Sequence, residues 1–462
     1  RADHAGSGGK TGKRDRVNGG RREWKCHMLK RVRIKGYKSL IDVEVKLQPL
    51  TVIFGPNASG KSNFLDALQL LSRLVSSRKL TEAFEPPYRG KPLESFSFPN
   101  AGIKGLLEQE SASFLIEVDF EVSQSIVDTV SQQIREMKRV PNGNASSRSP
   151  ENKAERLPVR ERNLRYRVEI EILPKSGTLR VVDEYLAALN KKGEVNTRNR
   201  FLERMDDHIS LRMEGQAHPS YIDLYLDHTI LSTRPYAPNY PHLTAARLEL
   251  ESWNFFYFEP RERMRAVNPV KEVRHIGSMG EELAAFLNTL KVVDEKQFRA
   301  VEKSLNAIVP SIEAIDVEVN NFGEVELRLI ENGIAIPARV VSEGSLRILG
   351  LLALQGAKEN ASLIGFEEPE NGIHPRRIEL IAALLKARSN ERTQFIVTTH
   401  SHRLTELIED TSLLVCRKGE GGTSLIPFSE LPIFRADRID HSLNDEPPTT
   451  IGERILRGDF DE

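Results

Sequence analysis

Cysteine is almost absent from the sequence. Cys26 and Cys416 are the only two cysteines among 462 residues. Two cysteines are too few for a disulfide-stabilised scaffold or a cysteine-rich zinc module. Three histidines, His242, His275 and His374, have no partners at the spacing of metal ligands, so no zinc site is predicted. A chain of this length can instead bury a core that stabilises roughly two to four structural units.

Long apolar runs and an excess of one charge are also missing. The longest apolar stretch, residues 346–357, contains Arg347 and Gln355 and is shorter than the roughly 20 apolar residues of a membrane span. The basic start of the chain is not followed by an apolar core, so it does not resemble a secretory signal. Lys plus Arg and Asp plus Glu both number 66. This balance excludes a general polycation that coats nucleic acid but leaves a local basic patch open. We therefore expect a cytoplasmic protein.

The hydrophobic pattern of the chain alternates between strand and helix. Strict alternation indicates half-buried strands, a short apolar run indicates a strand buried on both faces, and helical spacing indicates amphipathic helices. Strands are predicted at residues 30–34, 41–47, 50–54, 113–122, 164–173, 315–319, 325–330, 362–366 and 394–398. Helices are predicted at residues 62–74, 123–137, 280–290, 295–308, 345–354 and 375–387.

A glycine-rich loop lies between the predicted strand 50–54 and the predicted helix 62–74. It fits the pattern Gly-x-x-x-x-Gly-Lys-Ser in the strand–loop–helix context that this motif requires. The glycines let backbone N–H groups turn toward phosphate oxygens, and the helix start adds its positive dipole end. Lys61 supplies a charge at the β- and γ-phosphates, and the Ser62 hydroxyl can ligate Mg²⁺. The predicted nucleotide-binding residues of this loop are Gly55, Pro56, Asn57, Ala58, Ser59, Gly60, Lys61, Ser62 and Asn63.

Two acidic residues end a second buried strand. Glu367 and Glu368 follow the apolar run of residues 362–366, and α/β sheets bind ligands at the carboxyl ends of parallel strands. We assign Glu367 to the Mg²⁺ shell and Glu368 to the polarisation of the attacking water. The segment alone is also compatible with a solvated acidic turn. The glycine-rich loop elsewhere in the chain favours the catalytic interpretation.

A histidine follows a third apolar strand. His400 comes after the predicted strand 394–398, about thirty residues beyond Glu368. A histidine at such a strand end can hydrogen-bond a γ-phosphate or the attacking water. Most single histidines are ordinary loop residues, and His402 lies close enough to be a rival. We prefer His400 because it follows the strand directly, and we predict that Glu368 and His400 are the catalytic residues.

Ser342 and Gly344 open a further apolar helix. A serine and a glycine at a helix start can present N–H groups to a phosphate, while the serine can also act as a plain N-cap. The two roles are compatible because one helix start can serve both. We predict that Ser342 and Gly344 contact nucleotide.

The order of these motifs resembles the head of ABC-type ATPases, above all the RecF/SMC-like and OLD-like bacterial proteins often called AAA family ATPases. Residues 34–40 resemble the Gly-Phe-Lys-Ser-Phe opening of SMC heads, and residues 60–63 and 367–375 are similar to the bacterial branch. The matching stretches cover under a third of the chain. The resemblance implies an α/β fold, a P-loop NTPase of the ABC-ATPase head type, with a mixed sheet core, an inserted α+β region and a short arm.

The resemblance also implies a mechanism. In such heads two subunits sandwich two ATP molecules, and Ser342 and Gly344 of one subunit face the P-loop of the other. Lys38, in the SMC-like opening, is expected beside the nucleotide, and Glu370 and Asn371 are expected in the loop that crosses the interface. The implied cofactors are ATP and Mg²⁺. The resemblance implies that the protein is an ATPase that acts in DNA repair or antiphage defence. It also implies a homodimer or a higher oligomer, with DNA or a separately encoded nuclease as the partner.

Two alternatives from other classes stay open. One is a nucleotide-gated scaffold with negligible turnover, and the other is the ATPase subunit of a transporter. The short insert and the SMC-like opening argue against a transporter. About sixty residues follow His400, which is too few for the Toprim nuclease that OLD-type enzymes carry there, so no nuclease domain is expected.

The chain departs from the family pattern at three points. Glu343 brings a negative charge near phosphate, so it should point away or pair with a cation. The first Walker B acid is Glu367 rather than the more frequent aspartate. Gln109 is the candidate for the glutamine loop. These departures bear on the rate of hydrolysis more than on nucleotide binding.

Residues 255–258 are interpreted as a buried strand followed by a basic exit loop, with a nucleic-acid contact as the alternative.

Six segments are expected along the chain. The segments are a disordered basic leader (1–27), an ATPase part with the P-loop (28–122), a short helical arm and flexible linker (123–163), an inserted α+β region (164–335), a second ATPase part (336–430) and a C-terminal tail (431–462).

Overall fold

The computed structural model describes residues 29–98, 102–138, 158–216, 218–354, 361–389 and 393–431. The predicted leader, the polar linker over residues 141–157 and the tail from residue 432 lie outside the described residues. Within the described residues, no helix is both long and apolar enough to cross a membrane.

A six-stranded sheet forms the centre of the molecule. Its first five strands run parallel and the last is antiparallel. Strand β3 is apolar throughout because both faces are covered: Ile53 joins one core cluster, while Val52 and Phe54 join the other. The strand order is β10 (Asn254–Phe256), β15 (Leu363–Glu367), β16 (Gln394–Thr399), β3 (Leu50–Phe54), β17 (Leu413–Gly419) and β18 (Gly422–Pro427).

An eight-stranded antiparallel sheet packs above it. The burial of β5 alternates residue by residue, as expected for a strand with one face on the core. Residues 164–223 of the predicted inserted region extend the sheet begun by residues 29–121. The order is β2 (Leu40–Lys46), β1 (Leu29–Tyr37), β4 (Ala112–Glu121), β5 (Asn163–Leu173), β6 (Thr178–Leu189), β7 (Val195–Arg204), β8 (His208–Leu211) and β9 (Ser220–Asp223).

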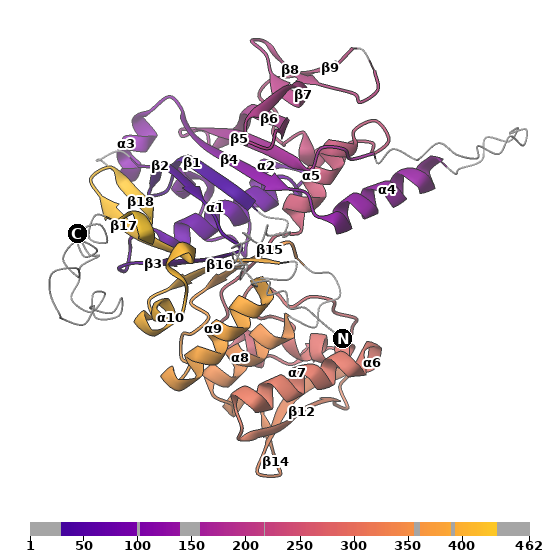
Figure 1. Ribbon diagram of the computed structural model, residues 1–462, viewed down its shortest axis with the longest axis vertical. Coiled ribbons are helices and arrows are strands. Elements are labelled where there is room, and N and C mark those ends of the chain that lie inside the picture. The colour runs from indigo at the N-terminus through magenta and orange to yellow at the C-terminus, as the bar shows by residue number, and fades with distance from the viewer. Residues whose placement is uncertain are drawn as a thin grey trace, which may run out of the picture.

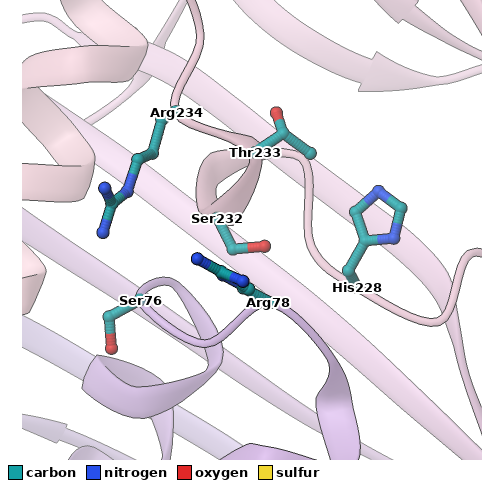
Figure 2. A pocket seen from close by; sticks show the side chains of 6 residues that line it. All are labelled: Ser76, Arg78, His228, Ser232, Thr233 and Arg234. Carbon is teal, nitrogen blue, oxygen red and sulfur yellow. The ribbon is translucent and has the colours of Figure 1, made fainter.

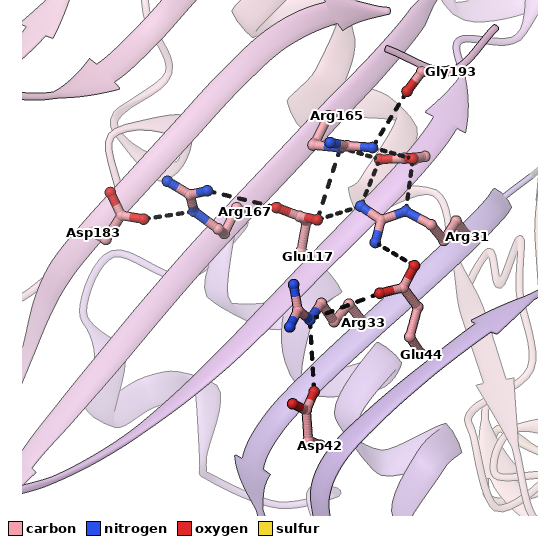
Figure 3. Close-up of polar contacts among 10 residues, drawn as sticks. Arg31, Arg33, Asp42, Glu44, Glu117, Arg165, Arg167, Asp183 and Gly193 are labelled. Atoms are coloured by element: carbon pink, nitrogen blue, oxygen red, sulfur yellow. Dashed lines mark hydrogen bonds and ion pairs between the residues drawn. The ribbon is translucent and has the colours of Figure 1, made fainter. Parts of the chain in front are cut away.

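The polar positions of this sheet form a ladder of ion pairs across neighbouring strands (Figure 3). Asp119 on β4 accepts from Arg31 Nε at 2.9 Å and from Arg165 Nε at 2.6 Å. Arg167 Nε lies 2.6 Å from Asp183 Oδ2 on β6. Such cross-strand pairs of opposite charge help to hold the register of the sheet.

Helix α1 (Lys61–Leu74) lies between the two sheets (Figure 1). Its apolar side chains belong to the same core cluster as Ile34 of β1 and Ile396 of β16. Because α1 begins at the P-loop and is buried on both sides, it fixes the loop relative to both sheets. The buried residues of α1 include Phe64, Leu65, Leu68, Leu71 and Leu74.

The other face of the six-stranded sheet is covered by helices and a small sheet (Figure 1). Their apolar residues form the second core cluster with Phe366 and Val397. The small sheet contains β11 (Asn268–Pro269), β12 (Ile312–Val319), β13 (Glu324–Glu331) and β14 (Ile334–Pro337). The helices are α6 (Leu283–Val293), α7 (Glu295–Ile308), α8 (Glu343–Ala353) and α9 (Pro375–Ser389).

Shorter helices complete the fold. The helix predicted at residues 123–137 is α4 (Gln124–Lys138), which projects from the body beside α5 (Pro241–Glu251) (Figure 1). The remaining α-helices are α2 (Leu80–Ala83), α3 (Gly102–Glu108) and α10 (His402–Glu406). The 3₁₀ helices are η1 (Pro92–Ser95), η2 (Leu231–Thr233), η3 (Arg263–Arg265), η4 (Ala338–Val340), η5 (Asp410–Ser412) and η6 (Phe428–Glu430).

Candidate nucleotide-binding site

The P-loop joins β3 to α1 and requires glycine at two positions. Gly55 and Gly60 have φ angles of 149° and 109°. A Cβ atom on Gly55 would lie 2.1 Å from the carbonyl oxygen of Cys416, and one on Gly60 would lie 2.2 Å from Thr423 Oγ1. The loop therefore packs so closely on β17 and β18 that no side chain fits at either glycine.

Lys61 folds back over the loop. Its Nζ donates to the carbonyl oxygens of Gly55 at 2.8 Å and Pro56 at 2.7 Å. Burial lowers the pKa of Lys61, while Cys416, Glu368 and Glu367 oppose this shift. The loop's own carbonyls thus hold the ammonium group at the start of α1, where a phosphate would be bound.

The carboxyl ends of three neighbouring strands meet at this loop. In the register of the sheet, Glu367 of β15 pairs with Thr398 of β16, and Thr399 pairs with Phe54 of β3. Glu367 and Glu368 at the end of β15 and His400 after β16 are therefore brought to the same sheet edge as the P-loop. This is the convergence that the sequence predicts, and it pairs the early strand β3 with β16, more than 300 residues later in the chain.

Glu368 and His400 contact each other. His400 Nε2 lies 3.2 Å from Glu368 Oε1, and both side chains are more than a third exposed. Glu368 has a φ angle of 45°, and its N–H donates to the Thr398 carbonyl at 2.9 Å. A non-glycine residue in this region is strained, which is common at functional sites. Burial and the charge of Lys61 lower the pKa of His400, so the imidazole is neutral at neutral pH.

Glu367 lies beside Ser62. Burial raises the pKa of Glu367, while Arg89 and a hydrogen bond with Ser62 act in the opposite direction. A hydroxyl and a carboxylate are the hard oxygen ligands that Mg²⁺ prefers. The residues at this point therefore fit a magnesium ion.

Arg89 already holds the carboxylate of Glu367. Its guanidinium binds both oxygens of Glu367, with Nη1 3.0 Å from Oε2, and it also pairs with Asp66 of α1 through Nη2 at 2.8 Å. The guanidinium lies 5.3 Å from the ring centroid of Tyr257. A magnesium ion at Glu367 would thus meet a cation that uses the same carboxylate.

Two other predicted nucleotide contacts face the β1–β2 turn. Lys38 Nζ lies 2.8 Å from Asp66 Oδ2, and Asn63 Nδ2 donates to Ser39 Oγ at 2.8 Å. Lys38 lies in the β1–β2 turn itself, and Asn63 lies in the first turn of α1. Their predicted contact with nucleotide stays a prediction.

Ser342 and Gly344 lie at the start of helix α8, in a different segment of the chain from the P-loop. The Ser342 hydroxyl accepts from the Ser345 N–H at 3.2 Å, so it is an N-cap, and Ser342 itself is exposed. A Cβ atom on Gly344 would lie 2.5 Å from the Gly372 carbonyl, so the helix start packs tightly on the loop after β15. Glu343 pairs with Arg261, whose Nε lies 2.8 Å from Glu343 Oε1. Of the two arrangements expected for Glu343, pointing away or pairing with a cation, the structure shows the ion pair.

The loop after β15 is anchored by Glu370. Its carboxylate is buried and accepts from Thr399 Oγ1, while Oε2 has no hydrogen-bond partner among the described residues. Burial raises the pKa of Glu370. Asn371 next to it is exposed.

Several residues of this site could not be predicted from the sequence. Arg89 and Asp66 carry no motif, and Arg261 lies 82 positions from its partner Glu343. Gln109, the candidate for the glutamine loop, lies in an exposed turn after α3, where its N–H donates to the Leu106 carbonyl. The acidic Glu343 beside a predicted phosphate site is a sequence signal for a nearby basic partner. The sequence does not identify that partner as Arg261.

Similar solved structures include heads of Smc proteins. The crystal structure of an SmcHead bound to the C-winged helix domain of ScpA has a TM-score of 0.51 and 15% sequence identity, and it covers 86% of this chain and 97% of that one. An Smc head with an extended coiled coil, bound to the C-terminal domain of ScpA derived from Pyrococcus furiosus, has a TM-score of 0.47, 11% identity and coverages of 90% and 99%. At such identity the first likeness shows the fold alone, and it confirms the expected P-loop NTPase of ABC-ATPase head type.

Two sequence comparisons show what the chain is similar to at the level of sequence. The OLD nuclease of Thermus scotoductus is 46% identical over 44 residues, which are 10% of this chain and only 8% of that protein. The family described as "AAA domain, putative AbiEii toxin, Type IV TA system" matches residues 50–406, well over half of the chain. The family match includes the P-loop, both glutamates and His400. The chain therefore belongs to this family of AAA-domain proteins, as the RecF/SMC-like and OLD-like resemblance predicts.

Proposed function

We propose that the protein binds ATP with Mg²⁺ and hydrolyses it. One observation carries the proposal: Lys61, Glu368 and His400 come from three separate segments and meet at one sheet edge. Two further observations support binding of ATP with Mg²⁺. The P-loop has glycine at both ends, and Ser62 lies beside Glu367.

Each side chain has a role that follows from its position. Lys61 at the start of α1 binds the β- and γ-phosphates, exchanging its two carbonyl acceptors for phosphate oxygens. Glu368 accepts a proton from the attacking water, and the neutral His400 orients that water or the γ-phosphate. Ser62 and Glu367 would hold Mg²⁺, which supplies charge neutralisation at the phosphates.

We further propose that ATP bridges two copies of the chain. Ser342 is exposed at the start of α8, where the positive dipole end of the helix would face a phosphate. A second copy would place its P-loop there, with Asn371 in the loop between the sites. DNA, or a separately encoded nuclease, is the proposed partner, and the short match to the OLD nuclease supports this direction.

The decisive variant is Glu368→Gln, which keeps the shape of the side chain and removes its basicity. Steady-state ATPase of the variant should fall by about a hundredfold or more, because general-base catalysis contributes this much. Binding of ATP, followed by calorimetry, should be retained. An unchanged rate would overturn the assignment of Glu368.

A second candidate is a nucleotide-gated scaffold that binds ATP, closes and turns over negligibly. The contact of Arg89 with Glu367 favours it, because a guanidinium on the metal-binding carboxylate opposes Mg²⁺. The Glu368→Gln measurement separates the two, since a scaffold has no turnover to lose.

A further inference from the structure

A cavity lies at the other end of α1 from the P-loop. Its volume is about 340 Å³, and it is lined by Ser76, Arg78, His228, Ser232, Thr233 and Arg234 (Figure 2). The first two residues belong to the loop after α1, and the rest belong to the segment around η2. The 14 residues of α1 span about 20 Å, so this cavity is separate from the nucleotide site.

Two arginines, Arg78 and Arg234, supply its charge. Figure 2 shows Arg234 reaching down from the η2 segment and Arg78 reaching up from the loop below, so that both guanidinium groups lie at the cavity. Among the described residues, neither guanidinium forms an ion pair or a hydrogen bond. Arg73 nearby is different, because its guanidinium donates to three backbone carbonyls. Free guanidinium groups of this kind match the geometry of phosphate oxygens.

The negative end of α1 is already compensated. The Ser76 hydroxyl donates to the Ser72 carbonyl at 2.9 Å, and the Ser76 N–H donates to the Arg73 carbonyl at 3.1 Å. Thr229 Oγ1 donates to the Leu74 carbonyl at 2.9 Å. The carbonyl dipoles of the helix end are therefore occupied and oppose an anion in the cavity only weakly.

The segment that carries Arg234 is held in place from behind. The buried carboxylate of Glu184 accepts from the N–H groups of Ile230 at 2.6 Å and Leu231 at 3.2 Å, and from the Tyr166 hydroxyl at 2.9 Å. Arg234 has a φ angle of 56°, a left-handed conformation that a non-glycine residue adopts only when its surroundings impose it. The guanidinium of Arg234 thus starts from a rigid backbone.

The hydroxyl groups of the cavity offer lone pairs rather than protons. Ser232 Oγ donates to the Thr229 carbonyl at 2.8 Å, and Thr233 Oγ1 donates to the Ile230 carbonyl at 2.7 Å. Each hydroxyl oxygen can still accept a hydrogen bond from a ligand. A ligand that satisfies the whole lining therefore combines a phosphate for the arginines with hydroxyl donors for the serine and threonine.

We propose that this cavity binds a small phosphorylated sugar, free or as part of a nucleoside monophosphate. Its volume suits a single compact ligand. The proposal does not depend on ATP binding at the P-loop, because the two sites lie at opposite ends of α1.

The test is a calorimetric titration of the full chain with ribose 5-phosphate, alongside inorganic phosphate and ribose. One site should be found, with ribose 5-phosphate binding more tightly than either fragment. Arg78→Gln and Arg234→Gln should each weaken binding by about tenfold or more, since each removes a charge-assisted pair. Arg198→Gln, at an exposed arginine of β7, is the matched control and should bind like the wild type, as should Lys61→Ala.

Four results would overturn the proposal. They are no binding of ribose 5-phosphate, equal weakening by Arg198→Gln, loss of binding in Lys61→Ala alone, and binding of a short oligonucleotide in place of ribose 5-phosphate. The last would make the cavity a nucleic-acid contact. If a glutamine variant unfolds, Arg78→Lys and Arg234→Lys keep the charge, and each should still bind more weakly than the wild type because the planar fork is lost.

Discussion

The guanidinium of Arg89 donates hydrogen bonds to both carboxylate oxygens of Glu367, which lies 278 residues later in the sequence. The same guanidinium holds Asp66, and Lys38 holds Asp66 from the other side. Two cations and two carboxylates thus form a chain of ion pairs, Glu367–Arg89–Asp66–Lys38, beside Ser62. Any divalent cation that binds Glu367 must compete with this network.

Removing Arg89 should strengthen Mg²⁺ binding. In Arg89→Ala the carboxylate of Glu367 loses a charge-assisted partner of about 1.5–3 kcal/mol, so the Mg²⁺ concentration at half-saturation should fall by about tenfold or more. Titration of Mg²⁺ in the presence of a non-hydrolysable ATP analogue, followed by calorimetry, measures this. Arg180→Ala, which removes another arginine–glutamate pair far from the site, is the control. An unchanged Mg²⁺ requirement would show that the network does not compete with metal.

ATP-dependent dimerisation should need both the P-loop and the start of α8. In a Glu368→Gln background that traps ATP, Lys61→Ala should remove the ATP-induced increase in mass, because the triphosphate loses its lysine. Ser342→Arg should also remove it, since a long cation would block the phosphate-facing helix start, while ATP binding by the monomer is kept. Light scattering with and without ATP measures the mass. Ser125→Arg, at an exposed serine of α4, should dimerise normally. A mass that ignores ATP in every variant would rule out the bridge.

The pKa of His400 should respond to its two neighbours in opposite directions. Lys61 lowers this pKa and Glu368 raises it, with burial as the largest lowering cause. Lys61→Met should therefore raise the pKa of His400, and Glu368→Gln should lower it further. NMR titration of the imidazole, assigned with His400→Gln, gives both values. In the nucleotide-free wild type the lowered pKa keeps the imidazole neutral at neutral pH, so the His400 contribution to the acid limb of kcat/KM for ATP, which reports the free protein, should lie below the ordinary histidine range. Shifts of the same sign in both variants would contradict the geometry.

Glu184 should make stability fall as the pH rises. Burial raises its pKa from 4.5 to about 7, against the hydrogen bonds from Ile230, Leu231 and Tyr166 and the charge of His228. Because the folded pKa is the higher one, the contribution is fully present below pH 4.5 and is lost as the pH passes about 7. The free energy of unfolding should drop by about 3 kcal/mol over this window.

Urea unfolding across that pH range tests the claim. Glu184→Gln should remove the slope, whatever it does to absolute stability. Tyr166→Phe should extend the slope to higher pH, because it deletes a hydrogen bond that favours the charged carboxylate. A slope that survives Glu184→Gln would assign it to another group.

Much of the local structure could be predicted from hydrophobic period and turn residues. Strand β3 occupies residues 50–54 as expected, because an apolar run without polar alternation needs cover on both faces. Helix α7 begins and ends at the predicted residues 295 and 308, since Asp294 caps it by accepting from the Gln297 N–H. Boundaries at α6 are shifted by three residues at each end, where capping is weaker.

The placement of the insert could not be predicted. Residues 164–335, predicted as an inserted α+β region that completes the head, contribute strands to three sheets, and the sequence did not indicate which sheet each strand joins. Strand partners in a sheet are chosen by shape and burial over long separations, and the period of one strand carries no record of its neighbour.

The sequence by itself determined which chemical groups the site contains and which elements present them, because the P-loop, the paired glutamates and the capped helix start are local patterns with local physical causes. Only the tertiary structure decided what each group faces. Glu367 pairs with Arg89, Glu343 pairs with Arg261, and Arg78 and Arg234 line one cavity at the far end of α1. Contacts between side chains far apart in the chain depend on the packing of whole sheets, and no window of sequence encodes that packing.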